Sequence, residues 1–165
     1  MEIVSRSTQQ TARIAALLAS LLRGGDVVFL IGELGAGKTY FIRKAAEALG
    51  VSEPVTSPSF TMAQTYRGKL TVHHLDLYRL AGFKAEDAID FEPFFEPGAV
   101  TFIEWPEQAE PFLERPAVVI RLEHLDPESR RISILAGRRN LLDELRRKLG
   151  VDTELEDASD SGGGA

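Results

Sequence analysis

The sequence predicts an α/β fold in which a central sheet of mixed parallel and antiparallel strands is flanked by helices. Three observations support this prediction. An apolar run at residues 27–31 is followed by a glycine-rich loop and then by a helix-like segment. A second apolar run, at 99–103, ends in an acidic residue. Between them, segments 60–66 and 70–78 alternate in polarity as strands do, with a turn at 67–69, and an antiparallel pair there would mix the strand directions.

The first helices follow from spacing and capping residues. Residues 7–23 predict a helix, because isoleucine and leucine recur at three-and-four spacing, and Ser7 or Thr8 can cap its N-terminus. The helix after the glycine-rich loop covers residues 40–49 and is closed by Gly50, the residue type that favours a helix C-terminus.

The second half of the chain adds strands and one more helix. Segments 117–123 and 130–135 predict strands, and 140–149 predicts a helix. Residues 54–60, with prolines and hydroxyl side chains, predict an ordered loop. The acidic, phenylalanine-rich segment 83–96 predicts a short helix followed by a loop.

Composition predicts one globular domain at residues 1–150 and an acidic, Gly/Ser-rich, disordered tail at 151–165. The tail holds five acidic residues and no basic one, so residues 1–150 carry about −1 of the net charge of −6, with 19 basic against 20 acidic residues. A nearly neutral body argues against broad binding to nucleic acid. No run is long enough to span a membrane and no signal-peptide pattern is present. We therefore expect no membrane association. The glycine-rich loop at 32–39 predicts a site that needs a supply of ATP or GTP, so we also expect a cytoplasmic location.

The segment Gly32–Thr39, GELGAGKT, fits the phosphate-binding loop pattern G-x-x-x-x-G-K-[ST] in its strand, loop, helix context. Glycines let backbone N–H groups turn inward around an anion, and the following helix directs its positive end to the same place. Lys38 can reach the β- and γ-phosphates from an exposed loop position, and the Thr39 hydroxyl can ligate Mg²⁺. The predicted nucleotide-binding residues of this loop are Gly35, Ala36, Gly37, Lys38, Thr39 and Tyr40.

Three acidic residues are candidates to serve the metal: Asp76, Glu104 and Glu107. Glu104 directly follows an apolar strand, which is the Walker B pattern. Asp76 also ends a candidate strand, so both acids can lie at the carboxyl edge of the sheet. Because Mg²⁺ takes only one or two protein carboxylates, we assign Thr39 and Glu104 to the metal. Asp76 would orient a metal-bound or attacking water, and the roles of the two acids could be exchanged.

Other side chains are less decisive. His73 and His74 are neighbours on a strand and point to opposite faces, so we expect packed or surface histidines rather than a metal pair. Trp105 is either core or a neighbour of the nucleotide. Arg130 or Arg131 could approach the nucleotide from a later strand.

Four segments together resemble the TsaE (YjeE) family: GELGAGKT at 32–39, SPSF at 57–60, HLDLYRL at 74–80 and IEWPE at 103–107. The resemblance runs from about residue 5 to about residue 149. It implies a small bacterial P-loop ATPase with a mixed central sheet, using ATP and Mg²⁺. Such proteins act with TsaD and TsaB in making N6-threonylcarbamoyladenosine at position 37 of tRNAs that read codons starting with A. The tRNA would be reached only through that complex.

Carried over to this sequence, the resemblance implies that Gly35–Thr39 hold phosphates, that Thr39 and Glu104 serve Mg²⁺, and that Asp76 is the family's acid in HxDLYRL. It also makes residues 57–60 a switch-like element. The family usually has threonine where this chain has Ser59, and serine keeps the hydroxyl for a contact with the γ-phosphate or the metal.

The sequence thus predicts an ATP hydrolase whose catalytic residues are Lys38, Asp76 and Glu104. Hydrolysis by the isolated chain should be slow, because its motifs contain no arginine finger. Two alternatives are a small-molecule kinase and a nucleotide-gated binding module without useful catalysis. A kinase usually has an arginine-bearing lid, and residues 83–96 hold Lys84 but no arginine. No base-reading N-K-x-D sequence occurs, which favours ATP over GTP.

Overall fold

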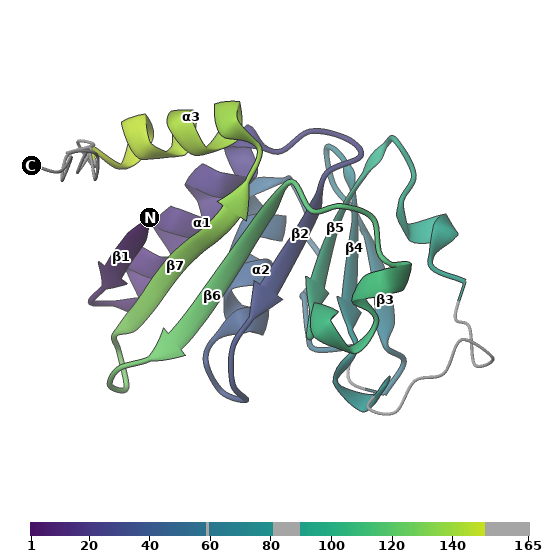
Figure 1. Cartoon of the computed structure of the whole chain (residues 1–165), viewed down its shortest axis with the longest axis horizontal. Helices are drawn as coiled ribbons and strands as arrows, with labels where there is room; N and C mark the ends of the chain where they lie inside the picture. The colour runs from purple at the N-terminus through teal and green to yellow at the C-terminus, as the bar shows by residue number, and fades with distance from the viewer. Residues whose placement is uncertain (59, 81–89, 151–165) are drawn as a thin grey trace, which may run out of the picture.

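The computed structural model describes residues 1–58, 60–80 and 90–150, which contain a seven-stranded sheet with helices (Figure 1). The strand order across the sheet is β1-β7-β6-β2-β5-β4-β3. The strands are β1 (Glu2–Ser5), β2 (Val27–Ile31), β3 (Ala63–Arg67), β4 (Thr71–Asp76), β5 (Ala99–Glu104), β6 (Val118–His124) and β7 (Arg130–Gly137). The helices are α1 (Thr8–Leu21), α2 (Lys38–Ala48) and α3 (Arg139–Leu149).

The sheet mixes both strand directions, as the sequence predicts. Strand β2 pairs in parallel with β5 and β6, and β4 pairs in parallel with β5. The remaining pairs, β3 with β4, β6 with β7 and β1 with β7, are antiparallel. The four central parallel strands therefore end at one edge of the sheet, and the segments that follow β2, β4 and β5 meet there. This edge is where ligands bind in open α/β sheets.

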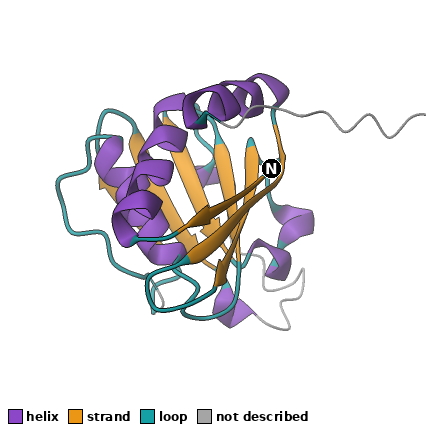
Figure 2. Cartoon of the chain, turned by 90° about the vertical axis from the view of Figure 1, so that its left-hand side faces the viewer, coloured by secondary structure: helices purple, strands orange, loops and turns teal. Residues whose placement is uncertain are grey.

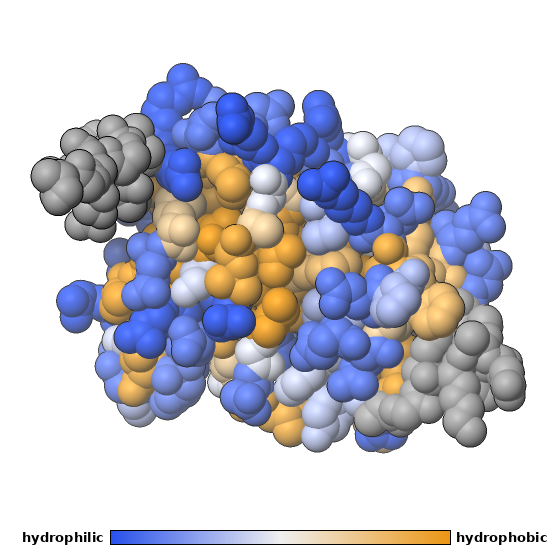
Figure 3. Space-filling model, in the orientation of Figure 1, coloured by the Kyte–Doolittle hydropathy of each residue, from blue (hydrophilic) through white to orange (hydrophobic). Residues whose placement is uncertain are grey.

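The two faces of the sheet are covered differently (Figures 1 and 2). Helices α1, α2 and α3 pack on one face, where Phe41 and Phe102 are fully buried in the larger core. On the other face a smaller core around Phe29 and Ile103 lies under short 3₁₀ segments, η3 (Glu92–Phe94), η4 (Pro106–Gln108) and η5 (Glu110–Phe112). In Figure 3, apolar side chains gather over the middle of the face that α1 and α2 leave open.

The capping of α1 and the extent of most elements match the sequence. Ser7 accepts a hydrogen bond from the backbone N–H of Gln10 at 3.1 Å, which is an N-cap contact. Strand β3 begins three residues later than expected, because the N–H groups of Thr61 and Met62 first donate hydrogen bonds back to the Pro58 carbonyl.

Among the described residues, none of the helices combines the length and the apolar character that a membrane span requires.

One strand was not predicted, one helix begins earlier than expected, and two expected segments lie outside the described residues. Strand β1 was not predicted, since only one of its four residues is buried and its pairing with β7 is long-range. Helix α2 begins at Lys38 rather than Tyr40. The first part of the segment 83–96, where a short helix was expected, lies outside the described residues at 83–89, as does the tail at 151–165.

Candidate nucleotide-binding site

The loop between β2 and α2 has the geometry of an anion-binding nest. Gly35 and Gly37 have positive φ angles of 77° and 101°, which other residues rarely adopt. Among the described residues, the amides of Gly35, Gly37, Lys38 and Thr39 donate no hydrogen bond, whereas the Ala36 amide donates to the Glu33 carbonyl at 3.1 Å. They border a cavity of about 240 Å³, together with Ser57, Asp76, Glu104 and Trp105. Free N–H groups at a helix N-terminus suit a phosphate group.

Lys38 is only 5% exposed, which corrects the expectation of an exposed loop side chain. Its Nζ donates to the carbonyl oxygens of Gly32 and Glu33, the second at 3.2 Å, and lies 4.1 Å from the ring centroid of Trp105. Burial lowers the pKa of Lys38 from its ordinary value. The carboxylates of Glu104, Asp76, Glu107 and Glu33 oppose that shift. The loop therefore folds back over its own lysine.

Trp105, whose ring contacts the Lys38 ammonium, has backbone angles that are rare for its residue type. Its φ and ψ are 56° and 48°, in the left-handed region that bulky residues seldom occupy. The ring lies 5.0 Å from that of Tyr78 and beside Lys38. The structure therefore places Trp105 at the edge of the cavity beside the loop and not in the centre of a core. Such strained residues cluster at functional sites.

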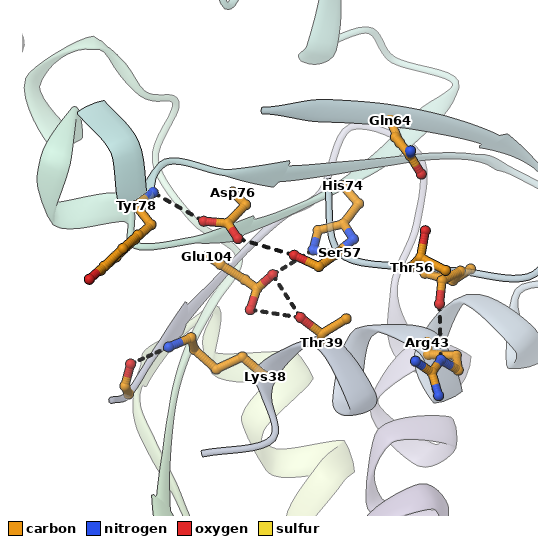
Figure 4. A network of polar contacts seen from close by, with 12 residues as sticks. Lys38, Thr39, Arg43, Thr56, Ser57, Gln64, His74, Asp76, Tyr78 and Glu104 are labelled. Carbon is orange, nitrogen blue, oxygen red and sulfur yellow. Dashed lines mark hydrogen bonds and ion pairs between the residues drawn. The ribbon is translucent and has the colours of Figure 1, made fainter. Parts of the chain in front are cut away.

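Glu104 ends β5 and is 3% exposed. The Thr39 hydroxyl, on the first turn of α2, lies 3.2 Å from both Glu104 carboxylate oxygens (Figure 4). Glu104 Oε2 also lies 2.7 Å from Nε2 of His74, which is fully buried on β4. Three separate elements thus converge on one buried carboxylate.

Asp76 ends β4 directly beside Glu104, since the two residues are paired in the register of the parallel strands. Side chains paired in this way leave the sheet on the same face. Asp76 accepts hydrogen bonds from the backbone N–H of Tyr78 at 3.0 Å and from the Ser57 hydroxyl at 3.4 Å. Figure 4 shows Asp76 above Glu104, with a dashed line joining Asp76 to the Ser57 hydroxyl. The structure therefore brings Lys38, Thr39, Asp76 and Glu104 to one place.

The remaining predicted residues are distributed around this centre. Tyr40 borders the cavity, but its hydroxyl donates to the Thr8 carbonyl at 3.0 Å and so ties α2 to the start of α1. Glu107 is exposed on η4 and lines a neighbouring groove of about 570 Å³. It contacts neither Thr39 nor Glu104 by hydrogen bond. Ser59 lies outside the described residues.

Arg130, at the start of β7, contacts the loop from its outer side. Its Nε donates to the Ala36 carbonyl at 2.9 Å, and its Nη1 donates to the Asp126 carbonyl at 2.8 Å. Arg131 instead lies 3.2 Å from Glu2 at the sheet edge. From the sequence, the two arginines are equal candidates. Strand alternation indicates that their side chains leave opposite faces of the sheet, but it does not indicate which of them approaches the loop.

His74 was missed as a functional neighbour of the site. The available signal was alternation, because residues 74 and 76 lie on the same face of a strand. His73 faces the other way, as expected, where its ring nitrogens meet Thr65 and Glu96.

The donor set fits a nucleotide-bound Mg²⁺. Among the described residues, no group of three or more histidine, cysteine, aspartate or glutamate side chains could hold a metal by itself. Mg²⁺ in nucleotide sites keeps several waters and takes one or two protein oxygens together with phosphates. The Thr39 hydroxyl and the Glu104 carboxylate are both oxygen donors beside free loop amides, which is the chemistry such an ion requires.

The chain is similar to known proteins over most of its length. The family model for "Threonylcarbamoyl adenosine biosynthesis protein TsaE" matches residues 5–132. A "tRNA threonylcarbamoyladenosine biosynthesis protein TsaE" of Treponema pallidum is 41% identical over 142 residues, covering 81% of this chain and 99% of that protein. The protein of the same name from Bacillus subtilis is 36% identical over 129 residues, covering 78% and 80%. The crystal structure of Bacillus subtilis YdiB superimposes with a TM-score of 0.75 at 30% identity, covering 90% of this chain and 95% of that one.

Proposed function

This chain belongs to the TsaE family, and from that premise we propose that it binds and hydrolyses ATP with Mg²⁺ to support N6-threonylcarbamoyladenosine synthesis on tRNA. A TsaD–TsaB-like complex would be its partner, the tRNA would be reached only through that complex, and the cytoplasm would be its location. The observation that carries the proposal is the contact of Thr39 with Glu104 at 3.2 Å, beside a loop of unpaired amides.

Binding would begin with the phosphates. The free N–H groups of the loop would donate hydrogen bonds to the β-phosphate oxygens, helped by the positive end of α2. The Lys38 ammonium would give up its hydrogen bonds to the Gly32 and Glu33 carbonyls and donate to phosphate oxygens instead. Phosphate oxygens carry more negative charge than backbone carbonyls, so the new hydrogen bonds would be stronger. This side chain needs little reorganisation, because burial already holds it beside the loop.

Hydrolysis would transfer the γ-phosphoryl group of ATP to water, with ADP as the leaving group. Thr39 and Glu104 would hold Mg²⁺, which supplies charge neutralisation on the β- and γ-phosphates when bound. Asp76 would orient the attacking water and accept a hydrogen bond from it, since its carboxylate lies beside Glu104 and borders the cavity. The products are ADP and inorganic phosphate.

The cavity offers little to stabilise the transferring group. Among the described residues that line it, Lys38 is the only cation. An arginine supplied by a partner is worth about 10³–10⁵ in rate in other P-loop proteins. We therefore expect slow hydrolysis by the isolated chain and at least about tenfold faster hydrolysis in complex with a TsaD–TsaB pair. Single-turnover assays with and without that pair test this, and equal rates would refute partner dependence.

Two measurements separate the proposal from its two alternatives: analysis of the reaction products, and tRNA modification supported by a Glu104→Gln variant. A small-molecule kinase would leave a phosphorylated metabolite in place of inorganic phosphate, which product analysis would detect. A nucleotide-gated module without useful catalysis would keep its support of tRNA modification after Glu104→Gln. The proposed hydrolase would bind ATP in that variant and fail to sustain turnover.

A further inference from the structure

His74 forms the most deeply buried polar contact of the site. Its side chain is fully buried, and Nε2 lies 2.7 Å from Oε2 of Glu104, which is itself 3% exposed. The other ring nitrogen, Nδ1, is buried and meets no hydrogen-bond partner in the described structure. Figure 4 shows the ring directed from β4 toward Glu104 and Thr39.

This pattern fixes which ring nitrogen carries the hydrogen. A carboxylate only accepts hydrogen bonds, so the contact at 2.7 Å requires a hydrogen on Nε2. A second hydrogen on Nδ1 would be a buried donor with nothing to receive it, which is costly. The contact is therefore an Nε2–H donor to Glu104, from a ring whose other nitrogen contributes no polar contact.

Burying a histidine with one unpaired ring nitrogen costs free energy that an apolar side chain at the same position would not. Packing alone therefore does not account for His74. We propose that His74 is a positioning residue, which holds Oε2 of Glu104 so that the carboxylate stays directed toward Thr39. This inference rests on the proposed function, because the orientation matters only if Glu104 serves Mg²⁺. Partners that orient metal ligands in this way are worth about 10–100-fold in metal affinity.

The test uses the full chain saturated with adenylyl imidodiphosphate, an ATP analogue that resists hydrolysis, and titrates Mg²⁺ by calorimetry. His74→Leu removes the donor and keeps the volume, and we expect it to weaken Mg²⁺ about 10–100-fold. His74→Gln places an amide N–H at about the reach of Nε2, and we expect Mg²⁺ affinity within about threefold of wild type. Binding of the analogue without Mg²⁺ should be unchanged in both variants.

The matched control is His73→Leu, because His73 is the neighbouring buried histidine on the opposite face and contacts Glu96 instead of Glu104. Unchanged Mg²⁺ affinity in His74→Leu, or equal losses in the Leu and Gln variants, would overturn the inference. If circular dichroism shows that His74→Leu does not fold, His74→Asn replaces it. The shorter amide reaches only the Nδ1 position, so Asn should lose affinity where Gln keeps it, and equal affinities would overturn the inference. If the wild-type chain saturated with the analogue bound no Mg²⁺ in this titration, the proposed function itself would be overturned.

Discussion

The glycine-rich loop at 32–39 lies between an acidic side, formed by Asp76 and Glu104, and a basic side, formed by Arg130. The two sides contact different parts of the loop. Toward β4 and β5, Asp76 and Glu104 face the cavity, and Glu104 contacts the Thr39 hydroxyl at 3.2 Å. Toward β7, Arg130 lies outside the cavity lining and binds the Ala36 carbonyl at 2.9 Å. The acidic side is thus placed to act on whatever binds, while the basic side acts on the shape of the loop.

The peptide between Ala36 and Gly37 shows how the basic side can work. The C=O and N–H groups of a trans peptide point in opposite directions. A guanidinium that holds the Ala36 carbonyl therefore directs the Gly37 N–H away from Arg130, and that N–H is one of the unpaired donors of the loop. Gly37 also has a φ of 101°, which side-chain-bearing residues rarely adopt, so the conformation depends on glycine.

The largest effect should come from the acidic side. Glu104→Gln keeps the side-chain shape and removes the charge that Thr39 and His74 now contact. We expect ATP hydrolysis to fall about 100-fold or more, with ATP binding retained. Glu107→Gln is the control, because Glu107 is an exposed acid three residues further on. Equal losses in both variants, measured in single-turnover assays, would show that the acids act only through general charge.

Removing the cation between the two sides should have the next largest effect. Lys38→Met keeps a buried stem beside Trp105 and removes the ammonium. Charge-assisted hydrogen bonds contribute about 1.5–3 kcal/mol each, so calorimetry should show ATP affinity reduced about 10–100-fold. Lys44→Met, on the exposed face of the same helix, should change it less than about twofold. Unchanged affinity in Lys38→Met would contradict the assignment of the site.

The basic side should give a smaller effect of a different kind. Arg130→Ala removes one hydrogen bond to the loop backbone, and we expect ATP and ADP affinities to fall together by about three- to tenfold. Arg131→Ala is the matched control, since Arg131 lies next to it and pairs with Glu2. A loss for ATP alone would instead mean that Arg130 contacts the γ-phosphate, and the distinction between the two sides would fail.

Much of the acidic side could be predicted because it follows from local patterns. The loop motif, the apolar strand before Glu104 and the strand ending at Asp76 are each visible within about ten residues, and parallel strands bring their ends together. Strand β1 could not be predicted in this way. It is a four-residue edge strand with a single buried side chain, and only its pairing with β7 defines it.

The unpredicted parts of the site all depend on contacts across the sheet. Lys38 is buried because the loop carbonyls and Trp105 close over it, and no motif states that closure. His74 meets Glu104, and Arg130 meets Ala36, only because the strand order and register place them there. Sequence periodicity gives the face of a residue but not the neighbour that it meets.

The smallest expected effect is a pH dependence that runs in opposite directions for stability and binding. Burial lowers the pKa of Lys38 below its ordinary value of 10.5, so between the lowered pKa and 10.5 the unfolded chain binds more protons than the folded one. The free energy of unfolding contributed by this group therefore rises with pH in that window. ATP affinity should fall over the same window, because binding uses the ammonium form. Denaturant melts and calorimetry of wild type against Lys38→Met would show both slopes, and the variant should lack them. If stability attributable to Lys38 instead fell with rising pH, the acids around Lys38 would outweigh its desolvation, and the acidic side would dominate the loop even without a ligand.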